Sequence, residues 1–349
     1  MSYTNGLDNP ELYFRIKLYT GNATDATGIT FDTTDTTMQP DLVWIKNRNS
    51  TNEHNLVNSV AGATKYLHAN LNQAETTAAN SLQSFDSNGF TVGTNANFNT
   101  NTNTYVAWCW KAGTTSGLSG GDITPSSYSY NATSGFGIYK YTGNGSTDQE
   151  IPHGLGKKPQ IVFYKRLDSS TNWVVQSNLL GNRVQLVIND TTAENTDSRL
   201  GASDDWSTTI FNVGTYGDMN SSSDPHVAYA FCNIQGYQKI GTYNGNGNAD
   251  GAFVYTGFKP AWVMIKNADN SSEEWGIWDS KRDVSNLMTR RLVANINAAE
   301  NTADYLDFVS NGFKLRTSAN GLNQSANLIY LAFAEAPFVN SKGVPCNAR

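Results

Sequence analysis

The sequence carries little charge and has no long apolar run. Charged residues make up 15% of its 349 residues, compared with about 25% in an ordinary soluble domain. Because the net charge is -6, no basic field that attracts phosphate backbones is expected, and nucleic acid is not an expected partner. Polar residues interrupt every hydrophobic stretch well short of the roughly 20 apolar residues of a spanning helix. We therefore expect no membrane insertion.

The sequence also lacks a secretory signal and has few cysteines. Residues 1–6 contain neither the basic region nor the apolar stretch of such a signal, so the general export pathway is not expected. Three cysteines at wide spacing predict neither a disulfide framework nor a paired metal-binding motif. Cys109 and Cys232 lie in apolar runs and are predicted to be core residues. Cys346 lies in a polar tail, where we expect no role.

An internal repeat dominates the sequence, which contains three copies of one unit. Each copy opens on an alternating strand with a Gly-Asn turn and continues through a proline to a hydrophobic strand that ends in lysine. A block that begins with Asn and ends with Glu follows, and an aromatic strand closes the copy. These anchors are the openings 14–22, 136–144 and 237–246; Pro40, Pro159 and Pro260; the blocks Asn70–Glu75, Asn189–Glu194 and Asn295–Glu300; and the closing strands Val106–Trp110, Val227–Phe231 and Ile329–Phe333.

The repeats set the expected domain boundaries. Residues 1–111 would form the first β-sandwich with a short N-terminal arm, 135–235 the second and 236–338 the third. The stretch 112–134 is rich in Gly, Ser and Thr and is interpreted as a linker or surface loop, and 339–349 as a polar tail. Short apolar alternations between Gly, Asn and Asp turns are typical of antiparallel strands. We therefore predict an all-β fold of three tandem antiparallel β-sandwiches, jelly-roll or lectin-like, with short helical turns in loops.

Within each unit, the strand after the proline is apolar at four successive positions and should be covered on both faces. Its largest aromatic side chain would bury about 150–250 Å²; these residues are Trp44, Phe163 and Trp262. The lysines at the ends of these strands are interpreted as marking the exit to solvent, with ligand contact as the alternative; they are Lys46, Lys165 and Lys266. Short helical turns are expected at 73–78 and 298–303.

Motifs that carry chemistry are few. The glycine-rich loops 154–158 and 245–251 follow no phosphate-binding spacing and open no helix, so they are interpreted as turns. Adjacent carboxylates on a strand would point to opposite faces, which does not fit the carboxylate pair of a glycosidase; this applies to Asp204-Asp205 and Glu273-Glu274. The histidines have no partner at ligand spacing and predict no zinc site; they are His54, His68, His153 and His226.

Two sets of acidic residues complete the candidates. Glu75, Glu194 and Glu300 recur in every unit, which favours a structural role over catalysis in triplicate. Asp32 to Asp35, Asp197 and Asp218 to Asp224 offer oxygen ligands for calcium but lack the spacing of an EF-hand. The sequence therefore predicts no catalytic, cofactor-binding or metal-binding residue and no enzyme activity. Its Asn, Gly and aromatic content suits carbohydrate binding and a solubilised structural module alike.

Several strings of the sequence carry a family resemblance. In the first unit they are Tyr19–Asn22, Pro40–Lys46, Asn58–Lys65, Phe85–Phe90 and Asn103–Gly113, and in the third Asp279–Arg282, Asn311–Phe313 and Ala332–Pro337. They resemble an uncharacterised repeat domain of virion proteins in tailed bacteriophages, especially marine and cyanobacterial ones, and the second unit resembles it loosely. In that family the positions of Asn58 and Ala61 tend to carry Asp and Arg, a pair that the third unit keeps as Asp279 and Arg282. Such a pair could form a salt bridge that holds a loop.

The resemblance implies a non-enzymatic bacteriophage structural protein, exposed on the virion surface and assembled in the host cytoplasm. As a tail-fibre-like or adhesin-like protein it would bind other virion subunits of the tail or capsid, and host cell-surface carbohydrate is a further expected ligand in host attachment. A capsid decoration (cement) protein without a receptor role is one alternative, and a polysaccharide depolymerase is another. A homo-oligomer is compatible with the sequence, although it lacks the heptads of a coiled-coil stalk.

Overall fold

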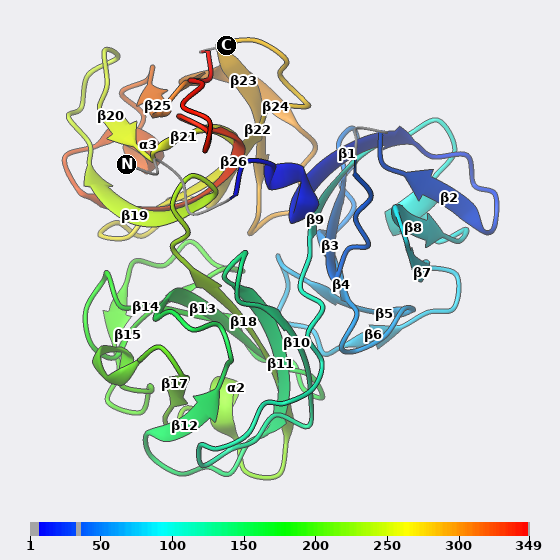
Figure 1. Cartoon of the computed structure of the whole chain (residues 1–349), viewed down its shortest axis with the longest axis vertical. Helices are drawn as coiled ribbons and strands as arrows, with labels where there is room; N and C mark the ends of the chain where they lie inside the picture. The colour runs from blue at the N-terminus through cyan, green and yellow to red at the C-terminus, as the bar shows by residue number, and fades with distance from the viewer. Residues whose placement is uncertain (1–6, 33–35, 348–349) are drawn as a thin grey trace.

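The computed structural model describes residues 7–32 and 36–347 and consists mainly of antiparallel strands, which confirms the all-β prediction. Its helical segments are each a single turn. Figure 1 shows three lobes around a common centre, one for each repeat along the chain. No helix in the described part of the chain has the length and apolar character needed to cross a membrane.

The elements follow the repeats. Unit 1 comprises η1 (Pro10–Leu12), β1 (Phe14–Thr20), β2 (Thr27–Thr30), β3 (Leu42–Asn47), β4 (Asn55–Asn58), β5 (Lys65–His68), β6 (Thr76–Thr77), β7 (Leu82–Asp86), β8 (Gly89–Val92), α1 (Ala96–Asn99) and β9 (Thr104–Trp110). Unit 2 comprises β10 (Ser127–Asn131), β11 (Phe136–Thr142), β12 (Gln149–Pro152), β13 (Pro159–Arg166), β14 (Val174–Ser177), β15 (Val184–Val187), β16 (Asn195–Thr196), η2 (Ser203–Asp205), β17 (Ile210–Val213), α2 (Gly217–Asn220) and β18 (Pro225–Cys232). Unit 3 comprises β19 (Gln238–Asn244), β20 (Phe253–Tyr255), β21 (Phe258–Asn267), β22 (Gly276–Asp279), β23 (Met288–Val293), β24 (Asn301–Val309), β25 (Gly312–Leu315), α3 (Asn320–Asn323) and β26 (Asn327–Pro337).

One strand order recurs in the three units. The large sheet runs β1-β9-β3-β4-β5-β6 in unit 1 and β11-β18-β13-β14-β15-β16 in unit 2, where β10 is added at the β11 edge. In unit 3 the order β19-β26-β21-β22-β23 continues through β24 into β25 and β20. The strands β2, β8 and β7 form a smaller sheet in unit 1, and β12 and β17 form one in unit 2. The closing aromatic strand of each repeat is therefore central in its sheet, between the opening strand and the strand after the proline.

The stretch 112–134 is more than the expected linker, because Ser127–Asn131 forms β10 and pairs with β11. Its alternation of serine and tyrosine has the period of a strand with one buried face. The carboxylate of Asp41 in unit 1 accepts hydrogen bonds from the Ala112 backbone N–H at 2.8 Å and the Ser129 hydroxyl at 3.0 Å. Glycine and serine content alone led to the linker interpretation, and this pairing corrects it.

Each closing strand divides its side chains between two cores. In β9, the residues Tyr105, Ala107 and Cys109 face the small sheet of their own unit, whereas Val106, Trp108 and Trp110 belong to a second core. Side chains alternate between the faces of a strand, so β18 and β26 divide their residues in the same way. The strands after the prolines share these two covered faces, and β3 is buried at every position, as predicted. Cys109 and Cys232 are fully buried, which confirms their expected place in the core.

The second core is common to all three units. Aromatic rings of different units meet there: Phe14 stacks on Phe333 at a centroid distance of 4.9 Å, and Trp110 lies 5.9 Å from Trp262 and 6.5 Å from Phe231. A small apolar cavity of about 30 Å³ lies among these rings. Buried aromatic side chains contribute several kcal/mol each to folding. The three sandwiches therefore enclose one shared core rather than standing as separate bodies.

A buried asparagine ends the short helix of every unit and holds the Gly-Asn turn. In unit 1 the Asn99 side chain accepts from the Asn22 N–H at 2.8 Å and donates to the carbonyls of Thr24 and Gly93. Equivalent hydrogen bonds are made by Asn220 in unit 2 and Asn323 in unit 3. The turn glycine is needed for close approach, since a Cβ on Gly21 would lie 2.1 Å from a backbone oxygen. The sequence analysis missed this clamp.

The helical turns expected at 73–78 and 298–303 do not form. Thr76–Thr77 is strand β6, and strand β24 begins at Asn301. The chain is held extended at these points because the backbone of the preceding glutamate bonds to another unit.

Candidate functional site

The seams between units bring together most of the recurring polar residues. The backbone N–H of each block glutamate donates to a carbonyl of the next unit: Glu75 to Leu167 at 2.8 Å, Glu194 to Ala268 at 2.7 Å, and Glu300 to Arg48 at 2.7 Å. Unit 1 thus contacts unit 2, unit 2 contacts unit 3, and unit 3 contacts unit 1, so the ring closes. The recurring block therefore closes the ring through its backbone, a bond that any residue except proline could make at this position.

A second set of hydrogen bonds repeats around the ring in the opposite direction. Trp173 Nε1 donates to the His68 carbonyl at 2.9 Å, and Trp275 Nε1 donates to the Val187 carbonyl at 3.0 Å. In each pair the indole of one unit binds the end of strand β5 or β15 in the preceding unit. Because an indole N–H has no acceptor function, this contact fixes the orientation of the ring at the seam.

His54 takes the equivalent position in unit 1. Its Nδ1 accepts a hydrogen bond from Trp44 Nε1 at 3.0 Å, which leaves the proton of the neutral ring on Nε2. The ring lies against the Val293 carbonyl of unit 3, although Nε2 makes no hydrogen bond of normal geometry. Burial, the largest cause, lowers the pKa of His54 well below its usual range.

The three repeat lysines are buried, so the prediction that they mark an exit to solvent is wrong. Lys165 Nζ donates to the carbonyl of Thr171 at 2.9 Å and to that of Asn72 in unit 1 at 3.2 Å. Lys266 Nζ donates to the main-chain carbonyl of Glu273 at 2.8 Å and to that of Thr191 in unit 2 at 3.1 Å. Carbonyl oxygens replace water around each ammonium group, and burial lowers the pKa of Lys46, Lys165 and Lys266 to about 8.

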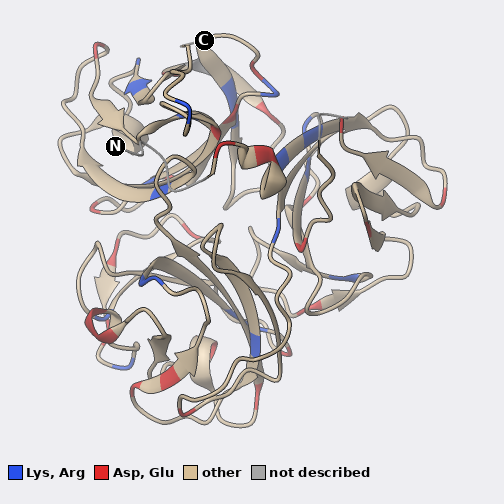
Figure 2. Ribbon diagram, viewed as in Figure 1, with Lys and Arg blue, Asp and Glu red and all other residues tan. Residues whose placement is uncertain are grey.

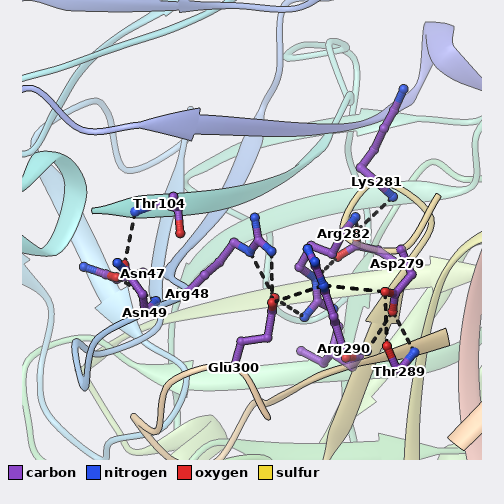
Figure 3. A network of polar contacts seen from close by, with 12 residues as sticks. Asn47, Arg48, Asn49, Thr104, Asp279, Lys281, Arg282, Thr289, Arg290 and Glu300 are labelled. Carbon is purple, nitrogen blue, oxygen red and sulfur yellow. Dashed lines mark hydrogen bonds and ion pairs between the residues drawn. The ribbon is translucent and has the colours of Figure 1, made fainter. Parts of the chain in front are cut away.

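Charged groups are sparse over the molecule (Figure 2), yet several converge at the seam between units 3 and 1. Figure 3 shows the Glu300 carboxylate between Arg48 of unit 1 and Arg282 of unit 3. Arg48 donates to both carboxylate oxygens, at 2.9 and 3.0 Å, and Arg282 contacts one of them at 3.2 Å. Arg282 also pairs with Asp279, and both side chains are fully buried. The predicted salt bridge of the pair three residues apart is therefore present.

The Asp279 carboxylate links this network to the shared core. It accepts a hydrogen bond from Trp108 Nε1 of unit 1 at 3.0 Å, and the Arg282 guanidinium lies 5.7 Å from the centre of the Trp108 ring. A cation over an indole face is attracted by the ring quadrupole. The pair thus holds the unit 1 tryptophan against unit 3.

The other two seams use neutral groups at the same positions. Asn58 of unit 1 donates to the Tyr229 hydroxyl of unit 2 at 2.9 Å, where unit 3 has Asp279 and unit 1 has Trp108. In unit 2 the equivalent residue is Ser177, which donates to the carbonyl of Gln160 within its own unit. Among the described residues one ion pair joins two units, that of Arg48 with Glu300, and it lies at the seam between units 3 and 1, which the chain does not cross directly.

Three surface grooves lie along the seams. Their volumes are about 210 Å³ beside units 3 and 1, 550 Å³ beside units 1 and 2, and 440 Å³ beside units 2 and 3. The first is lined by Arg15, Phe31, Lys281 and Glu335; the second by Asp41, Ser59, Lys111 and Tyr128; and the third by Asn233, Gln238, Lys239, Tyr255 and Thr256. Amide, hydroxyl and aromatic groups predominate in the third groove, which suits neutral polar ligands.

The remaining sequence candidates lie apart from one another. Asp204 and Asp205 are in η2, and Glu273 and Glu274 are in the loop before β22, so the argument from opposite strand faces was wrong for both doublets. Among the described residues no group of three His, Cys, Asp or Glu side chains could hold a metal ion.

Three carboxylates of the loops considered for calcium form ion pairs. Asp197 pairs with Arg199 at 2.6 Å, and Asp224 pairs with Arg166 at 2.8 Å. Asp32 pairs with Lys17 at 2.6 Å, and Asp35 lies outside the described residues. Cys346 is partly buried and contacts the Ser310 carbonyl at 3.1 Å.

His153 in unit 2 predicts a loss of stability in acid. Its buried Nδ1 accepts from the Leu155 N–H at 3.0 Å and Nε2 faces the Ser207 carbonyl at 3.3 Å, so the ring is held neutral, and burial lowers its pKa to about 4. Below about pH 6.5 the unfolded chain gains a proton there that the folded chain does not. Unfolding free energy should therefore fall by about 3 kcal/mol from this group as pH decreases from about 6.5 to about 4.

The measurement is denaturant unfolding of the wild type and of His153→Asn at several pH values. The asparagine oxygen can accept the Leu155 hydrogen bond but takes up no proton in this range. The difference in unfolding free energy between the two proteins should shrink as pH falls, because only the wild type loses the contribution of His153. Buried carboxylates whose pKa is raised, such as Glu75 and Glu194, affect both proteins equally. A constant difference from pH 7 to 4 would contradict the prediction.

Comparison with known proteins gives one match. A family model described as a domain of unknown function (DUF7483) matches residues 9–337 and so spans all three units. No curated protein and no solved structure matches the chain.

Proposed function

The chain belongs to the DUF7483 family, and we propose that its three units act together as one non-enzymatic structural module of a tailed-bacteriophage virion, displayed on the tail. The phage assignment is supported by the resemblance of the strings in units 1 and 3 to virion repeat domains. In this role the module binds other virion subunits and presents its grooves to host surface carbohydrate.

One observation supports the proposed structural role: the polar groups that recur in the repeats form hydrogen bonds that hold the three units together. The lysine ammonium groups are surrounded by main-chain carbonyls, the backbone N–H groups of the block glutamates donate to neighbouring units, and the Glu300 carboxylate binds Arg48 of unit 1. A catalytic acid or base has to reach a substrate proton from an accessible position. Residues that form bonds between units and are buried at the seams are not accessible to a substrate, and they suit a rigid, long-lived component of the particle.

The test is to locate the protein on the phage particle that encodes it. Mass spectrometry of purified virions should detect the chain, and cryo-electron microscopy should show a three-lobed body on the tail. Copies at capsomer centres would assign capsid decoration in place of a tail role. Absence from the particle, or release of new reducing ends from host envelope polysaccharide by the purified protein, would overturn the proposal.

A further inference from the structure

Strand β20 of unit 3 holds two aromatic side chains in solvent. Phe253 is 50% exposed and Tyr255 is 60% exposed, whereas Val254 between them is 5% exposed. Because alternate residues of a strand point to opposite faces, both rings lie on the outer face while Val254 enters the core. β20 pairs with β25 and ends the strand order of its sheet. An aromatic pair on an exposed edge strand invites unwanted association unless it has a ligand.

The repeats show that the fold does not require aromatic residues at these two positions. The register places one buried aliphatic residue opposite one phenylalanine in every unit: Val254 with Phe313, Ile29 with Phe90, and Ile151 with Phe211. The neighbours that correspond to Phe253 and Tyr255 are Gly28 and Thr30 in unit 1, and Glu150 and Pro152 in unit 2. The aromatic pair is therefore specific to unit 3.

Tyr255 also forms part of the wall of the 440 Å³ groove between units 2 and 3. The side chains of Asn233, Gln238 and Thr256 line the same groove together with Lys239. Two other lysines nearby are paired, Lys314 with Asp250 at 2.8 Å and Lys259 with Glu335 at 3.0 Å. An aromatic surface beside hydrogen-bonding groups and a single lysine matches a ligand with apolar and hydroxylated faces.

We propose that the outer face of β20 and this groove bind a neutral, hexose-based oligosaccharide. Phe253 and Tyr255 would each cover the apolar face of a sugar ring, and they are about 7 Å apart along the strand. The partly exposed side chains of Asn233 and Lys239 in the groove would meet the hydroxyl groups. A protein partner is less well matched, since a stable interface covers about 800 Å² on each side, whereas a groove with a few convergent polar groups fits a small ligand.

This inference rests on the proposed role on the virion surface and assigns the carbohydrate contact to one place. The experiment uses the full chain with maltotriose, cellotriose and N-acetylchitotriose as probes, by saturation-transfer NMR and calorimetry. At least one trisaccharide should bind, and Phe253→Thr combined with Tyr255→Thr should weaken it at least ten-fold. Threonine is the residue that unit 1 has at the Tyr255 position. The matched control is Leu179→Thr, which removes another exposed apolar side chain, 39% exposed in unit 2, and should leave affinity unchanged.

Failure of all three probes to bind, or equal affinity in the double variant with an unchanged melting temperature, would overturn the inference. Conversion of a wild-type dimer to a monomer by the double variant, without sugar binding, would assign the face to self-association and also overturn it. Location of the chain on the particle is measured independently of sugar. A protein found on the tail that binds no trisaccharide would therefore refute this site and leave the structural role standing.

Discussion

Replacement of Arg282 by alanine should lower the free energy of unfolding by about 3–5 kcal/mol, the usual effect of removing one partner of a buried ion pair. The guanidinium neutralises Asp279 and contacts Glu300, and it covers the Trp108 ring. Without it, the Asp279 carboxylate stays buried with only hydrogen bonds to compensate its charge. Guanidinium chloride unfolding followed by tryptophan fluorescence would measure the change, because the network holds Trp108.

The repeat supplies a matched control for this variant. Unit 1 has Asn58 and Ala61 at the positions of Asp279 and Arg282, and the Asn58 oxygen accepts from the Ala61 N–H at 2.8 Å as Asp279 does from the Arg282 N–H at 2.9 Å. Asp279→Asn combined with Arg282→Ala reproduces that neutral pair. It should be more stable than Arg282→Ala alone, since no unpaired buried charge remains.

An exposed ion pair gives the second control. Lys17→Ala removes a contact to Asp32, whose side chain is 74% exposed, and should cost less than about 1 kcal/mol. If Arg282→Ala costs no more than Lys17→Ala, the buried network does not hold the seam between units 3 and 1.

The repeat itself could be read from the sequence because its anchors are local. Prolines, Gly-Asn turns and alternating apolar residues depend on the backbone geometry of a few neighbouring residues. The salt bridge between Asp279 and Arg282 was predictable for the same reason, as the two residues are three apart in one turn.

The way the units assemble could not be derived from local pattern. A lysine that follows an apolar strand, such as Lys165, looks like an exit to solvent, and only the presence of Asn72 from another unit shows that it is buried. Arg48 and Glu300 are farther apart still in the chain. Hydrophobic alternation indicates that one face of a strand is covered. It does not show whether the covering residues belong to the same unit or to a neighbouring one.

The shared core predicts that unit 1 does not fold alone. In the isolated segment 1–111, the inner face of the large sheet would expose Trp44, Trp108 and Trp110 along with the aliphatic residues beside them. Three indole rings of about 150–250 Å² each, at about 25 cal/mol per Å², correspond to a loss on the order of 10 kcal/mol. That is comparable to the entire stability of a typical domain.

The segment should therefore show no cooperative thermal transition by circular dichroism and should bind a hydrophobic dye. The matched control keeps every contact but cuts the chain: a protease site at Ser116 and Gly117, which are exposed, allows cleavage between units 1 and 2. The cleaved protein should elute as one species with a transition close to that of the intact chain, because the bonds between units are non-covalent and the seams are unchanged. A cooperative, monomeric unit 1 would show that its aromatic face is stable in water, and the ring would then be an association of independent domains.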